Sequence, residues 1–204
     1  MKVLSHIIST IFSPLLMPTY AVIIAMFCTM LSLTPLTLRW SVSLFIWGIT
    51  CVLPVLCIYL LYRLKFLSDV QLNNQKERMV PYIITGLSYL ASAFFLWRSH
   101  APAWLALFMM GGALAVVIDV IVNRWWKISA HGSATGGVIA LCFRIMNLGA
   151  EVNGETMQWV TIGVIIVAGL VGTARLLLER HTLGQVLAGN ANGFLCVYFI
   201  TAIN

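Results

Sequence analysis

The sequence predicts an all-α fold, a polytopic bundle of about six or seven transmembrane helices. Of its 204 residues, 61% are apolar and 9% are charged, whereas a soluble domain has about 45–50% apolar and about 25% charged residues. Apolar stretches near 20 residues, the length that a helix needs to cross a bilayer, recur along the chain. No linker or repeat separates them. We therefore expect one membrane domain over 1–204, with no room for a soluble one.

Seven apolar windows are the candidate crossings, and tryptophans lie near several of their ends, as is typical at the headgroup level. The windows are 15–33, 40–61, 80–97, 104–122, 132–148, 159–178 and 182–203. The first has no small-residue cleavage site, so we expect a retained crossing rather than a secretory signal. Alternatively, Pro14 or Pro18 divides it into an interfacial piece and a shorter crossing. The fifth window is the weakest, because it is short and carries Arg144.

Charge and cysteine usage narrow the classes of partner. The net charge is +6, but the basic residues are scattered among apolar runs rather than clustered as nucleic-acid binding requires. Membrane lipids and phosphorylated lipids are the expected partners, and nucleic acid is not. The five cysteines lie in apolar stretches without a CxxC pair, so we expect neither a disulfide framework nor a zinc site.

The predicted topology collects most basic residues on one side of the membrane. Nine of the twelve fall there: Lys2, Arg63, Lys65, Lys76, Arg78, Arg124, Lys127, Arg175 and Arg180. The positive-inside rule would make this side cytoplasmic. Several of these cations are also candidates for binding a ligand, so the count leaves the orientation open.

Three polar segments interrupt the apolar chain, and all three fall on the basic side. They cover 68–81, 123–133 and 175–185. Each has a plain structural interpretation: a solvated loop, a helix cap at Ser129 with a basic anchor, and a basic helix end. None of these explains why two histidines, a serine and several cations converge from separate loops, since polar groups in a membrane protein are costly unless they are paired, hydrated or useful.

The residue types in these segments suit phosphate chemistry. The candidate phosphate-binding cations are Lys76, Arg78, Lys127 and Arg175, and arginine offers a planar bidentate donor. Ser129 would add a hydroxyl at the start of a helix, where backbone N–H groups attract anions. Of two histidines, one can attack phosphorus and the other can protonate the leaving oxygen. A metal is the weaker alternative, because the neighbouring cations would repel it; we expect no metal and no cofactor.

The segments resemble the three motifs of the type 2 phosphatidic acid phosphatase superfamily, K-x6-R-P, P-S-G-H and S-R-x5-H-x3-D. The third motif is the best match, with Ala174-Arg175, then His181, then Gln185. The second appears as 128–131, Ile-Ser-Ala-His. The first is degenerate, with Lys76, Arg78 and a delayed Pro81. The resemblance divides the domain into N-terminal crossings over 1–62 and a phosphatase-like core over 63–203.

The resemblance implies a role for each matched residue. His181 would be the nucleophile that forms a phosphohistidine, and His131 would be the general acid. Arg175, Ser129, Arg78 and Lys76 would hold the phosphate, with Lys127 beside them. Gln185 stands where the family has an aspartate that orients the nucleophile, so we expect lower activity or a substitute carboxylate. Asp119, near the basic end of its window, and Glu179 are the candidates for that supporting role.

The sequence therefore predicts a metal-independent membrane phosphatase in a bacterial cytoplasmic membrane. Its substrate would be a phosphorylated or pyrophosphorylated lipid, such as undecaprenyl diphosphate, phosphatidylglycerol phosphate, phosphatidic acid or a lipid A phosphate. A lipid phosphotransferase, a non-catalytic lipid-phosphate binder or transporter, and a membrane scaffold subunit are the alternatives. The substrate, the side that the site faces and the oligomeric state stay open.

Overall fold

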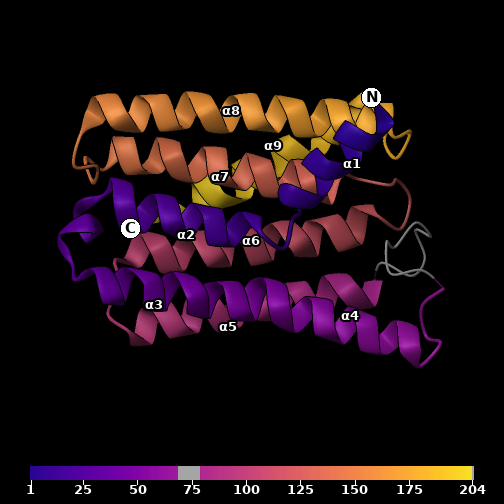
Figure 1. Ribbon diagram of the computed structural model, residues 1–204, viewed down its shortest axis with the longest axis horizontal. Helices are drawn as coiled ribbons and strands as arrows, with labels where there is room; N and C mark the ends of the chain where they lie inside the picture. Colours follow the sequence, from indigo (N-terminus) through magenta and orange to yellow (C-terminus); the bar gives the residue numbers. More distant parts are fainter. Residues whose placement is uncertain (69–78, 204) are drawn as a thin grey trace.

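Helices make up most of the chain in the computed structural model, which describes residues 1–68 and 79–203. The elements are α1 (Lys2–Ile11), α2 (Met17–Cys28), the 3-10 turn η1 (Met30–Leu33), α3 (Leu36–Trp47), the π turn η2 (Gly48–Val52), α4 (Leu53–Arg63), α5 (Met79–Arg98), α6 (Ala103–Val122), α7 (Ala130–Asn147), α8 (Gly154–Leu177) and α9 (Leu183–Thr201). They pack side by side along one long axis (Figure 1). The predicted all-α helical bundle is confirmed.

Five helices of the described chain are long and apolar enough to cross a membrane. They are Leu36–Arg63, α5, α6, α8 and α9. Their bounds follow the predicted windows closely, as at 80–97 against Met79–Arg98. Their outward surfaces carry large apolar side chains such as Leu56, Phe94 and Ile166, as expected of surfaces that face lipid.

The first predicted crossing, 15–33, is wrong as a single span. Helix α2 has 12 residues, about 18 Å at 1.5 Å per residue, against about 30 Å of hydrocarbon. A separate short helix, α1, precedes it, and the break between them contains Pro14. The alternative interpretation, a short piece followed by a shorter helix, describes this region better.

The fifth predicted window, 132–148, forms α7, but α7 is not among the five membrane-length apolar helices. It lies in the interior of the bundle, where Ala140, Leu141 and Ile145 are fully buried. Surrounding helices cover α7, so small and polar residues can replace apolar ones on it. Arg144, the residue that weakened the prediction, donates from Nη2 to the carbonyl of Thr201 (3.0 Å) and so joins α7 to the end of α9.

The second predicted crossing, 40–61, contains a π turn that was not expected. Residues Gly48–Val52 join α3 to α4 as one continuous helical segment. Pro54 has no backbone N–H and lies at the start of α4, and a π turn is one way in which a helix accommodates such a residue. The segment therefore bends without ending.

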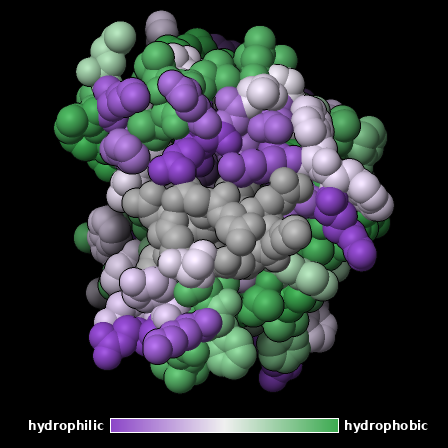
Figure 2. All heavy atoms as spheres, turned by 90° about the vertical axis from the view of Figure 1, so that its right-hand side faces the viewer, coloured by the Kyte–Doolittle hydropathy of each residue, from purple (hydrophilic) through white to green (hydrophobic). Residues whose placement is uncertain are grey.

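One end of the bundle collects two of the three predicted polar segments, and most of the third, 68–81, lies outside the described residues. Residues 123–129, residues 178–182 and the first turns of α7 and α9 meet there, on the right of Figure 1. We call this region the polar end. Hydrophilic side chains gather on it when the molecule is viewed from that side (Figure 2). The described basic residues at helix ends, including Arg63 and Arg175, follow the predicted sidedness.

Candidate phosphate site

Helices α7 and α9 both begin at the polar end and pack against each other. They run in the same direction and lie side by side (Figure 1). Their glycines meet the backbone of the opposite helix. A Cβ atom on Gly136 would overlap the carbonyl oxygen of Asn190, and one on Gly193 would overlap that of Ser133. Small residues spaced four apart allow such close approach of membrane helices. This close contact brings the polar residues at the starts of both helices into one place.

Ser129 is fully buried and caps α7. Its hydroxyl accepts from the backbone N–H of Gly132 (3.2 Å), and its own N–H donates to the carbonyl of Gln185 (3.2 Å). The hydroxyl thus satisfies one of the backbone donors that every helix start leaves open. The structural interpretation of Ser129 as an N-cap is confirmed, and phosphate binding by this residue stays a prediction.

His181 lies in the short connection between α8 and α9 and is 8% exposed. Its Nδ1 is 3.1 Å from the carbonyl oxygen of Lys127 and 3.3 Å from Oε1 of Gln185. The Gln185 amide is oriented by the N–H of Thr182, which donates to the same oxygen (3.1 Å). Both atoms beside Nδ1 are acceptors, so Nδ1 carries a proton, and in the neutral form of the ring the lone pair is on Nε2.

Gln185 thus contacts the ring of His181 through its amide oxygen, and a role for this contact in a reaction stays a prediction. It also completes a capping box with Thr182 at the start of α9. An amide oxygen can fix the tautomer of an imidazole, although it lacks the charge with which a carboxylate stabilises imidazolium.

His131 and Arg175 reach the site from the first turn of α7 and the last turn of α8. Both contact one residue of α1. Arg175 Nη1 donates to Ser9 Oγ (2.8 Å), and His131 Nε2 lies 3.1 Å from Ser9 Oγ and 3.0 Å from the Ser9 carbonyl oxygen. A carbonyl oxygen can only accept, so Nε2 of His131 carries a proton that it can donate.

The predicted supporting carboxylates differ in their surroundings. Asp119 is 2% exposed, and its Oδ1 accepts from Ser133 Oγ and from Asn192 Nδ2, both at 2.9 Å. These bonds join α6, α7 and α9, so Asp119 has a packing role. Glu179 is exposed and adopts φ 54°, the left-handed conformation that ends α8. Substitution for the missing aspartate by either residue stays a prediction.

Lys127 contributes its carbonyl to His181, and its side chain is half-buried. The two other predicted cations, Lys76 and Arg78, lie outside the described residues. In residues 1–68 and 79–203, no three His, Cys, Asp or Glu side chains come together as a metal ion would require. The five cysteines are free.

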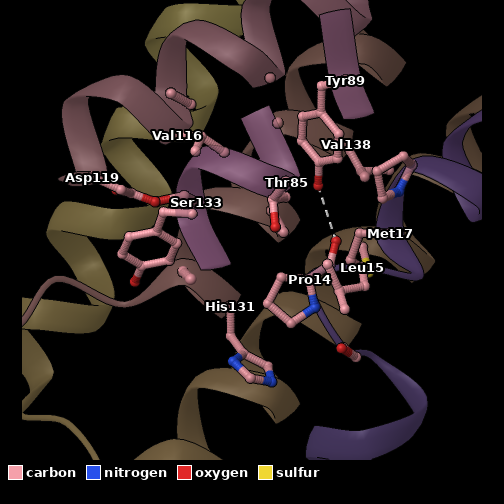
Figure 3. Close-up of a pocket in the computed structure, with 18 of the residues that line it drawn as sticks. Pro14, Leu15, Met17, Thr85, Tyr89, Val116, Asp119, His131, Ser133 and Val138 are labelled. Atoms are coloured by element: carbon pink, nitrogen blue, oxygen red, sulfur yellow. Dashed lines mark hydrogen bonds between the residues drawn. The ribbon is translucent and has the colours of Figure 1, made fainter. Parts of the chain in front are cut away.

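A cavity of about 260 Å³ opens beside these groups. His131, Arg175, His181 and Asp119 lie in its wall, and most of the remaining lining is apolar: Pro14, Leu15, Met17, Pro18, Ile58, Phe108, Val116, Val138 and Val197. Figure 3 shows His131 at one end and Tyr89 at the other, with Pro14 and Leu15 along the side. The cavity thus has a few polar side chains in a wall that is otherwise mostly apolar.

Ser9 is the site residue that the sequence reasoning missed. A serine in an apolar run changes the local hydropathy little, and its partners lie 122 and 166 residues away. The available signal was the pair Ser5 and Ser9, whose spacing of four residues puts both on one face of a helix.

No protein-family model, curated protein or solved structure matches this chain.

Proposed function

We propose that this chain is a membrane-embedded lipid phosphatase similar to the type 2 phosphatidic acid phosphatases, with His181 as the nucleophile. The observation that carries the proposal is the orientation of His181. Its Nδ1 lies against Lys127 O and Gln185 Oε1, so Nε2 is the nitrogen that would attack phosphorus. The proposed localisation is a bacterial cytoplasmic membrane.

The proposed reaction has two steps. First, Nε2 of His181 attacks phosphorus, the bond to the lipid oxygen breaks, and His131 donates a proton to that oxygen. Arg175 neutralises charge on the phosphoryl oxygens. Water then attacks the phosphohistidine, His131 accepts its proton, and phosphate leaves with His181 restored. Hydrolysis of a monoester or of a diphosphate would follow the same path.

The apolar lining of the cavity supports a lipid as the substrate. The wall groups His131, Arg175 and His181 are polar, whereas Leu15, Phe108 and most of their neighbours are not. A ligand that fits both parts has a phosphate at one end and a hydrocarbon tail at the other. Phosphatidic acid and a polyprenyl diphosphate both have this form.

A non-catalytic lipid-phosphate binder is the second candidate, and the neutral Gln185 favours it. An amide beside His181 stabilises the positive imidazolium less than a carboxylate does. A binder would keep the cations and the cavity but release no phosphate.

The test is phosphate release from phosphatidic acid and from a polyprenyl diphosphate by the full chain in detergent. His181→Gln keeps a polar side chain but removes the nucleophile, so we expect a loss of at least about 1,000-fold in release with phosphate binding retained. His100→Asn is the matched control, because His100 lies at the opposite end in a left-handed conformation that asparagine tolerates. Release that survives His181→Gln would contradict the mechanism. Phosphate binding without release by the native chain would favour the binder.

A further inference from the structure

Helix α1 turns two serines inward, while its outward surface carries large apolar side chains alongside polar ones such as His6. Ser5 and Ser9 are 3% and 8% exposed, whereas Val3, Leu4, Ile7 and Ile11 are all at least 48% exposed. A surface helix of a soluble protein shows the reverse pattern. A short helix with an outward apolar face is suited to lying in the membrane interface. The buried Ser5 and Ser9 must therefore satisfy their hydrogen bonds within the protein.

The inward face of α1 meets the proposed phosphate site at Ser9. Its hydroxyl accepts from Arg175 Nη1 (2.8 Å), and its carbonyl accepts from His131 Nε2 (3.0 Å). Two oxygens of one residue thus take hydrogen bonds from a guanidinium and an imidazole. In the proposed reaction, the same two side chains serve the oxygens of the substrate.

We propose that Ser9 is the resting occupant of the phosphate site, and that α1 must withdraw before a lipid phosphate can bind. This inference rests on the proposed function. The phosphate oxygens would take the positions that the Ser9 oxygens hold against Arg175 and His131. Binding is then a competition between α1 and the ligand, with affinity reduced by the fraction of molecules in which α1 is docked.

The attachment of α1 fits an element that can move as a unit. It packs mainly on α8 and is joined to α2 through residues 12–16, which contain Pro14. Its end is held by the Tyr20 hydroxyl, which donates to the carbonyl of Ile11 (2.9 Å). Residues 12–16 would be the hinge of this movement. They are held by the Tyr89 hydroxyl, which donates to the carbonyl of Pro14 (3.1 Å; dashed in Figure 3). Each of these two attachments is a single hydrogen bond, whereas α7 and α9 are held together by direct contact of their backbones at glycines.

The experiment measures binding of inorganic phosphate to the full chain in detergent by isothermal titration calorimetry, with two substitutions of opposite expected sign. Ser9→Ala removes the acceptor of Arg175, so the docked state of α1 becomes less favourable and phosphate should bind about 5–10-fold more tightly. Ser9→Asp gives Arg175 a charged partner on α1, and phosphate should bind at least about 10-fold more weakly. Thermal unfolding is followed in parallel.

Ser5→Ala is the matched control. Ser5 lies one turn earlier on the same buried face, and its hydroxyl donates to the carbonyl of Met1 (3.2 Å). We expect its phosphate affinity to equal that of the native chain. Arg175→Ala should abolish binding and so reports separately on the phosphate site.

Each outcome bears on one of the two proposals. Weaker or unchanged phosphate binding in Ser9→Ala, with binding still lost in Arg175→Ala, overturns the resting-occupant role of Ser9 and leaves the proposed function standing. A loss of affinity in both Ser9 variants, matched by lower unfolding temperatures, assigns Ser9 a structural role and also overturns the inference. Absence of phosphate binding in every variant overturns both.

Discussion

Two regions of the molecule meet at the candidate site, and they are attached to the bundle in different ways. Helices α7 and α9 approach so closely that Gly136 and Gly193 meet the opposite backbone. Helix α1 contacts the same site through the two oxygens of Ser9. The first attachment admits no added carbon atom, while the second combines side-chain packing on α8 with a few hydrogen bonds. We call α7 and α9 the rigid half of the site, and α1 the detachable half, because our proposal requires α1 to withdraw.

Breaking the rigid half should have the largest effect. Gly193→Ala adds a Cβ atom that overlaps the carbonyl of Ser133, so α7 and α9 must separate. We expect a destabilisation of about 3 kcal/mol and loss of phosphate binding, measured by thermal unfolding and calorimetry.

Gly169→Ala in α8 is the control for this substitution, because a Cβ atom on Gly169 meets nothing within 4 Å. Alanine favours a helix over glycine by about 1 kcal/mol, so this variant should be as stable as the native chain or more so. Equal unfolding temperatures for the two variants would show that the α7–α9 contact is not rigid.

The polar junction of α6, α7 and α9 should give the next effect. Asp119→Ala leaves the Ser133 hydroxyl and the Asn192 amide, both of which now donate to Oδ1, without that acceptor. We expect a loss of about 2 kcal/mol in unfolding free energy. Asp119→Asn keeps an oxygen acceptor and should lose less than half as much, as measured by chemical denaturation in detergent.

The same pair of variants tests whether Asp119 replaces the aspartate that is absent at position 185. A packing role predicts that Asp119→Asn keeps near-native phosphate release. A strong drop in release at native stability would assign its charge to the reaction instead.

The smallest effect should come from the hinge beside the detachable half. Tyr89→Phe removes the hydroxyl that donates to the Pro14 carbonyl and keeps the ring. We expect about 1 kcal/mol of destabilisation and faster amide hydrogen exchange in residues 2–11, with exchange in α7 unchanged. Equal exchange in residues 2–11 of both proteins would show that this bond does not restrain α1.

The sequence predicted the long helices well, because the thickness of the bilayer sets their length directly. The window 104–122 differs from α6 (Ala103–Val122) by one residue. Hydropathy failed at α2, whose apolar run is cut short around Pro14 and Thr29. The hydropathy signal was weakest at α7, because protein rather than lipid surrounds this helix and its small residues allow close packing.

The candidate site was predictable where its residues follow one another along the chain. His181 and Gln185 lie one helical turn apart, so their contact could be anticipated from spacing. The Ser129 cap was anticipated for the same reason. The Ser9 contacts join α1 to α7 and α8, and no local pattern encodes which distant helix will face a given serine.

The separation of Ser9 from its partners also sets an order of assembly. During synthesis, α1 emerges first, while Arg175 lies 166 residues later and domains form progressively from the N-terminus. Throughout translation of the intervening helices, the inward face of α1 lacks the guanidinium and imidazole that receive it in the finished protein. Ser9 is thus made well before the side chains that it contacts, and its bond to Arg175 can form only after the end of α8 has been made.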